Sequence, residues 1–172
     1  MSLAELKIVA SLGVNCDVAK VEGDNSPNHR DYSSSSMSKQ RNFGTTGALS
    51  NKLWSAKFSP AATVAVQHSL GGTNGVALLD VFGDAVIFTL IHGFFLKNTG
   101  ATILSLDGGD VTNGWTALFP NNTDTITIPV GAMVGFLASA DAGFAVVSTE
   151  LVRVTNTDGV VAGEYQVTAF GR

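Results

Sequence analysis

Apolar residues form their longest run between Ala85 and Leu96, where only Thr89, His92 and Gly93 interrupt them. The run is rich in β-branched and aromatic residues, which favours a strand over a buried helix. Both alternating sets of positions are apolar, so we expect a strand that is buried on both faces. One face would meet the core of the domain, and a second copy of the protein is a natural cover for the other. The run is too short for a membrane-spanning helix, which needs about 20 apolar residues.

One of these alternating sets contains Ile87, Ile91 and Phe95. If the other set faces the core, these three side chains point away from it. We therefore take them as candidate contacts between copies in a homo-oligomer.

Alternation of apolar and polar residues recurs along the rest of the chain. Gly, Asn and Asp cluster between the alternating segments, at the spacing expected of a β-sandwich or barrel. The segment from Leu49 to Phe58 is ambiguous between a short helix and a strand. We predict an all-β protein: a single antiparallel β-sandwich of jelly-roll type over residues 1–172. Besides the central run, the predicted strands cover residues 6–12, 18–21, 63–70, 76–81, 101–106, 124–130, 133–138, 144–147, 151–155 and 164–169, with 144–147 and 151–155 forming either one bulged strand or two short ones.

Residues 22–47 lose this alternation and are polar, with four consecutive serines. A long segment of this kind is typical of a flexible surface loop or arm. Such an arm could lie over a neighbouring subunit, or it could be a simple surface excursion. Its Arg30, Tyr32 and Arg41 are further candidate contacts to another copy or to a capsid partner.

Charged residues make up only 14% of the chain, against about 25% in typical soluble domains. A surface poor in charge suits a subunit buried in an assembly, although an ordinary sandwich with Ser- and Thr-rich faces has the same composition. The formal net charge is −4, and the only basic cluster, Lys39–Arg41, is short. We therefore expect no binding to nucleic acid, which requires a basic stripe. Cys16 is the only cysteine, and the first residues lack the pattern of a signal peptide; both fit synthesis in a reducing compartment.

The sequence lacks the common catalytic motifs, including the hydrolase nucleophile elbow, the zinc-protease helix motif, the phosphate loop and the dinucleotide fingerprint. We predict that the protein is not an enzyme and needs no cofactor or metal. His68 and His92 fall on apolar positions of predicted strands, where they could bind a metal only if the strands were adjacent and a third ligand were present. Asp107 and Asp110 flank two glycines and could bind Ca²⁺ weakly, but their spacing is not that of a known calcium loop.

Trp115 follows an Asn-Gly pair in a loop. An exposed ring there could stack on a sugar, which makes Trp115 the candidate ligand-stacking residue of a carbohydrate-binding sandwich. The alternative is a tryptophan that covers the end of the sandwich core.

The second half of the chain contains a characteristic series of short sequence features. They are Leu79–Asp80, Phe82–Gly83, the apolar run ending at Leu96–Asn98, a small-residue loop with Trp115, a Thr/Ile strand before Pro129–Gly131, Leu151–Asn156, and Tyr165–Val167 before Gly171. In these features residues 76–172 resemble small β-sandwich structural proteins of the virions of tailed phages and prophages.

The resemblance implies a non-enzymatic virion protein that is made in the host cytoplasm. It implies capsid decoration or stabilisation, or a place at the tail or vertex. The implied partners are further copies of the chain, with a trimer among the options, and the major capsid protein. No membrane or nucleic acid is implied. A carbohydrate-binding module of a tail or spike is the alternative function, and an enzyme is the third.

Overall fold

The computed structural model describes residues 7–13, 36–42, 52–80, 83–110, 112–121, 123–138 and 143–172. The chain divides into two compact units, residues 1–42 and residues 43–172. All regular secondary structure in the described residues is β-strand. Within these ranges no helix is long and apolar enough to span a membrane.

The first unit contains an antiparallel pair of strands, β1 (Lys7–Gly13) and β2 (Ser36–Asn42). β1 matches the predicted first strand. β2 lies inside the segment 22–47, where no strand was expected from the sequence. The sequence of β2 has no apolar alternation, so this pattern could not reveal the strand. β2 pairs with β1 through backbone hydrogen bonds, which do not depend on apolar side chains.

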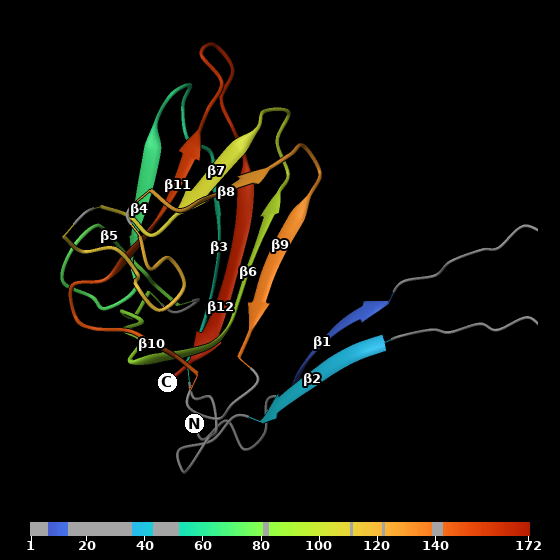
Figure 1. The fold of residues 1–172 in the computed structure, drawn as a ribbon, viewed down its shortest axis with the longest axis vertical. Coiled ribbons are helices and arrows are strands. Elements are labelled where there is room, and N and C mark those ends of the chain that lie inside the picture. Colours follow the sequence, from blue (N-terminus) through green and yellow to red (C-terminus); the bar gives the residue numbers. More distant parts are fainter. Residues whose placement is uncertain are drawn as a thin grey trace, which may run out of the picture. The chain divides into compact units, whose positions relative to one another are not determined.

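The second unit consists of two five-stranded sheets (Figure 1). In the first, here called the β6 sheet, β9 and β10 follow one another along the edge of β6 that is not paired with β12. Its strands are β3 (Lys52–Phe58), β12 (Tyr165–Gly171), β6 (Leu90–Asn98), β9 (Met133–Leu137) and β10 (Phe144–Ala145). The second, here called the β11 sheet, has the order β5 (Val76–Ala77), β4 (Ala65–Ser69), β11 (Leu151–Asn156), β7 (Leu104–Asp107) and β8 (Thr125–Ile128).

Strand order identifies the sandwich as a jelly roll. We leave out the two-residue strands β5 and β10 and number the remaining strands of the sandwich from 1 (β3) to 8 (β12) in chain order. The order across the β6 sheet is then 1, 8, 3 and 6, and the order across the β11 sheet is 2, 7, 4 and 5. This is the order of two Greek keys wrapped into two sheets. Among the pairings between the described strands, the short one of β4 with β5 is parallel and the others are antiparallel. The predicted antiparallel, jelly-roll-like β-sandwich is therefore confirmed.

The core lies between the sheets and is built by the alternation read from the sequence. In β8, Ile126 and Ile128 point inward and Thr125 and Thr127 are exposed. The ambiguous segment ending at Phe58 forms β3, and the segments around 144–147 and 151–155 are separate strands in different sheets. Among the described residues, the largest fully buried side chains of this core are Trp54, Trp115, Tyr165, Phe88 and Phe94.

The central strand is shorter than predicted, because β6 begins only at Leu90. The preceding residues are apolar for another reason. Val86 and Phe88 donate their backbone N–H groups to the carbonyls of Leu78 and Leu70, and both side chains are buried. They close the end of the core from the connection between β4 and β6 instead of extending the strand.

β6 is buried on both faces, and the chain itself provides part of the outer cover. Phe94 faces the core, whereas Gly93, Phe95 and Lys97 point outward. A Cβ atom added at Gly93 would lie 2.4 Å from Cζ of Phe170, so this ring lies over the glycine. A second copy as the cover of the remaining outer face stays a prediction.

Candidate functional site

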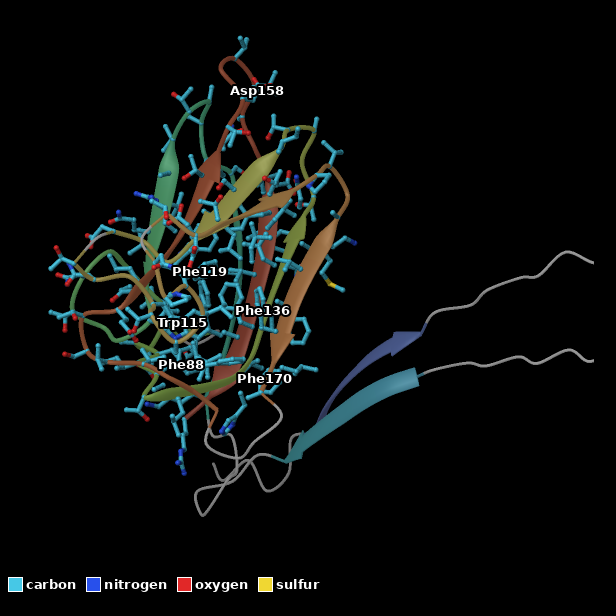
Figure 2. All side chains as sticks on the ribbon, in the orientation of Figure 1. Phe88, Trp115, Phe119, Phe136, Asp158 and Phe170 are labelled. Carbon is cyan, nitrogen blue, oxygen red and sulfur yellow. The ribbon has the colours of Figure 1, made fainter. Side chains whose placement is uncertain are left out.

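Trp115 is not available for stacking on a sugar, because its side chain is 0% exposed. Its indole Nε1–H donates to the carbonyl of Ala145 at 2.9 Å, and its ring makes edge contacts with Phe94 and Phe144. Figure 2 shows it inside the sandwich, on the side of Phe88 and Phe119. The prediction of a stacking residue is wrong. A buried Trp needs a partner for its N–H, and here that partner is the carbonyl of Ala145. The Asn-Gly pair before Trp115 suggested a surface loop, but the side chain that follows the pair points into the core.

Ile91 is wrong as a contact between copies, because it is fully buried in the core. The pairing of β6 with β12 shifts register here: Phe170 lies opposite Gly93, but Gly171 lies opposite Ile91. This irregularity breaks the period of two, as a β-bulge does. A Cβ atom at Gly171 would lie 1.9 Å from the carbonyl oxygen of Leu90, so the close approach of the two strands requires glycine.

Ile87 and Phe95 both reach the surface, but from different places. Ile87 is exposed outside the regular strand, and its side chain lies over Gly72. Phe95 is half-buried on the outer face of the β6 sheet and stacks on Phe170, with ring centroids 6.3 Å apart. Their role as contacts stays a prediction.

The three candidates in the N-terminal third are not tested. Arg30 and Tyr32 lie outside the described residues. Arg41 belongs to β2, of which the structure describes the backbone and not the side chains.

The histidine pair and the two aspartates each have a structural environment of their own. His68 lies on β4 and His92 on β6, which belong to different sheets, so the two histidines are not on adjacent strands. Asp107 accepts hydrogen bonds from Arg153 and from the N–H of Gly109, and its ion pair with Arg153 spans 3.0 Å. Asp110 accepts the N–H groups of the two residues at 112 and 113, which hold the pKa of its carboxyl below its usual range. In the described ranges no three His, Cys, Asp or Glu side chains are grouped to bind a metal.

His68 is buried in an aromatic box. Its Nε2 is 2.6 Å from Oη of Tyr165, and its ring contacts Trp54 and Phe58. Its Nδ1 has no hydrogen-bond partner, and burial lowers the pKa of the imidazole to about 4. The side chain is closed off from solvent, so the fold favours the neutral imidazole. A buried side chain in this position cannot exchange protons with a substrate in solution.

Acid should therefore weaken the fold through His68. Its folded pKa of about 4 lies below the ordinary 6.5, so the unfolded chain binds the proton first as the pH falls. The contribution of the neutral His68 side chain to the free energy of unfolding is complete above pH 6.5. About 3 kcal/mol of it is lost on acidification toward pH 4. Urea unfolding at pH 7 and pH 4.5 should show this loss, and the non-titrating variant His68→Gln should show a much smaller one. Equal pH dependence in both proteins would contradict the assignment.

Two buried asparagines organise one end of the sandwich, where four short connections meet. Nδ2 of Asn98 donates to the carbonyls of Thr102, Ile128 and Pro129 at 2.7–3.1 Å. Nδ2 of Asn156 donates to carbonyls on two other connections, at Ala61 and Val161. We call this the four-loop end: residues 59–64, 99–103, 129–132 and 157–164. Sequence reasoning missed it, because an asparagine at the end of a strand resembles any turn residue.

The four-loop end exposes apolar side chains and little charge. Asp158, at its tip in Figure 2, accepts the N–H groups of Val160 and Val161 at 2.8 and 2.7 Å. Val160 is 89% exposed. Further exposed apolar residues of this end are Val64, Ile103, Val130 and Val161.

Three long connections lie together elsewhere on the sandwich, joined by hydrogen bonds such as Leu70 N–H to the Glu150 carbonyl and Leu151 N–H to the Asn113 carbonyl. These segments, residues 70–89, 108–124 and 138–150, contain no lysine or arginine. We call their described part the acidic end. Its acidic residues are Asp80, Asp84, Asp110, Asp124 and Glu150.

The outer face of the β6 sheet is the third surface, and only the strand register reveals it. Neighbouring outward positions form three rows: Leu53, Phe170, Gly93 and Leu137; Ser55, Thr168, Phe95 and Gly135; and Lys57, Gln166, Lys97 and Met133.

The sequence was compared with family models, curated proteins and solved structures. None of the three comparisons found a match.

Proposed function

We propose that this chain is a non-enzymatic structural protein of a tailed-phage virion that decorates or stabilises the capsid. It acts by self-association and by binding the major capsid protein, and needs neither cofactor nor metal. It is made in the host cytoplasm and ends up in the virion. Its partners include neither nucleic acid nor membrane.

The observation that carries the proposal is the rigid, apolar four-loop end. A protein that works by attachment must present a fixed contact surface, and surfaces that are ordered in advance lose less entropy on binding. Asn98 and Asn156 fix the connections from inside, and Asp158 fixes the turn that carries Val160 and Val161. We place the capsid contact at this end.

The buried polar groups support the same function. The carboxylate of Glu150 accepts the N–H of Val147, and the N–H and hydroxyl of Thr116. Together with the two asparagines, it uses its hydrogen bonds to hold connections between strands. A jelly roll held in this way supplies rigidity, which a capsid-stabilising protein needs.

The first test is quantitative mass spectrometry of gradient-purified particles from the source culture. We expect the chain at a copy number comparable with that of the major capsid protein. A few copies per particle would contradict capsid decoration and place the protein at the vertex or tail. Absence from particles would overturn the virion function.

A variant pair then tests the four-loop end. Val160→Asp combined with Val161→Asp should weaken binding to particles that lack the protein by about tenfold or more, since two exposed apolar contacts are replaced by charges. The matched control is Thr155→Asp, on the outer side of the β11 sheet. Co-sedimentation measures both. Equal binding by the two variants would contradict a capsid contact at the four-loop end.

A further inference from the structure

We propose that the outer face of the β6 sheet binds the acidic end of a second copy of this chain. This inference rests on the proposed function, since it assigns the surface through which the self-association occurs.

The centre of the outer face is flat and apolar. Phe95 and Phe170 stack with 22° between their ring planes. Each ring lies over a glycine of the neighbouring strand: a Cβ atom at Gly135 would lie 2.5 Å from Phe95, as one at Gly93 would from Phe170 at 2.4 Å. Because the glycines have no side chains, the rings do not stand out from the sheet. Phe170 is only 2% exposed, so the half-buried Phe95 is the ring of this pair that a partner would contact. An aromatic ring on a flat surface is typical of the centre of a protein interface.

Met133 extends this face toward the edge strand β9, where it is 63% exposed. Leu53 and Leu137 lie beside Phe170 in the first row and are half-buried. The accessible apolar side chains of this face are therefore Leu53, Phe95, Leu137 and Met133, and Phe170 is buried among them.

The same face is positively charged. Lys57 and Lys97 lie in its third row, and none of its outward strand positions carries Asp or Glu. Glu164, just before β12, is 3.8 Å from Lys57, and both side chains are largely exposed. An exposed pair of this kind is worth little, so it leaves the lysines free to meet another acidic group.

Charge complementarity selects the occupant. The segments of the acidic end contain five described acids, of which Glu150 is buried, and no basic residue. Lys52, whose Nζ donates to the carbonyl of Ile87, and Arg172, whose backbone pairs with Leu90, lie beside this end, so acids still outnumber bases there. The outer face contains Lys57 and Lys97. Two outer faces against each other would bring lysine against lysine. An outer face against an acidic end brings opposite charges together, which favours the encounter and fixes the orientation. Two lysines are too few for nucleic acid, which the acidic end would also repel.

The resulting contact is heterologous, with a different surface on each copy. Such contacts form closed rings when the rotation between copies closes, and filaments when it does not. A ring agrees with the small homo-oligomer that we propose.

A charge-swap experiment tests the inference. The first variant, Lys57→Glu with Lys97→Glu, reverses the face; the second, Asp84→Lys with Ser148→Lys, reverses the acidic end at two exposed positions. Each should weaken self-association in sedimentation velocity by about tenfold or more at low salt. The chain that carries all four substitutions should regain it, because both surfaces are reversed together. Thr127→Glu, on the outer side of the β11 sheet, is the control and should associate like the unmodified chain.

Recovery in the fourfold variant cannot come from misfolding, so it supports the contact directly. A fourfold variant that associates no better than the twofold ones, or twofold variants that associate normally, would overturn the inference. An unmodified chain that is monomeric would also overturn it. The proposed virion function is decided separately, by the presence of the chain in particles.

Discussion

Replacing Trp115 with alanine is expected to lower the free energy of unfolding by about 3–5 kcal/mol. The indole is fully buried between Phe94 and Phe144, and its N–H donates to the carbonyl of Ala145. The change leaves a cavity at the end of the core and an unsatisfied backbone carbonyl. Urea unfolding followed by far-UV circular dichroism measures the loss without relying on the fluorescence of the second tryptophan, Trp54.

Trp115→Phe separates the two contributions. The smaller ring keeps most of the packing but cannot donate a hydrogen bond, so we expect a loss of about 1–3 kcal/mol. A loss below about 1 kcal/mol for Trp115→Ala would mean that the ring is not buried as described. It would also reopen the hypothesis that Trp115 is exposed and binds a sugar.

The strands with regular alternation were predictable from the sequence. In β8 and in the last strand, β12, inward residues such as Ile128 and Val167 alternate with outward Thr127 and Thr168. A period of two is a property of the backbone, and it survives wherever one face is buried and the other is not. This is why the fold class could be inferred before the strand order was known.

The predictions failed where tertiary structure interrupts the period. Val86 and Phe88 look like a continuation of β6, yet they cap the core from a connection. Ile91 shares the sequence alternation of Phe95, but the irregular pairing near Gly171 places it in the core. Both outcomes depend on which strand lies beside β6, and local sequence does not contain that information.

The candidate surfaces were hidden for the same reason. Lys57, Lys97 and Met133 are distant in sequence and become neighbours only through the pairing of β3, β12, β6 and β9. The sequence did contain one signal: the long connections lack lysine and arginine altogether. Counting charges by connection, instead of over the whole chain, would have revealed the acidic end.

Asn98→Asp is the substitution that tests most directly whether the four-loop end is held from inside. The new side chain has the same shape, but a carboxylate would replace an amide that donates to the carbonyls of Thr102, Ile128 and Pro129. Oxygen would then face oxygen in a fully buried site. We expect a loss of about 3–5 kcal/mol at pH 7, the range measured for an uncompensated buried charge.

The pH dependence of this variant distinguishes charge repulsion from simple loss of packing. Burial and the facing carbonyls raise the folded pKa of the new carboxyl above its unfolded value, so its protonated form is favoured in the fold. Relative to the unmodified chain at each pH, the deficit should be largest at pH 7 and shrink to about 1–3 kcal/mol as the pH falls toward 4, where one O–H can donate again. Gln166→Glu, the same change of chemistry at an exposed position of β12, should cost less than about 0.5 kcal/mol. A deficit in Asn98→Asp that does not change with pH would show that Asn98 acts through its volume, and the rigidity that we assign to the four-loop end would lose its cause.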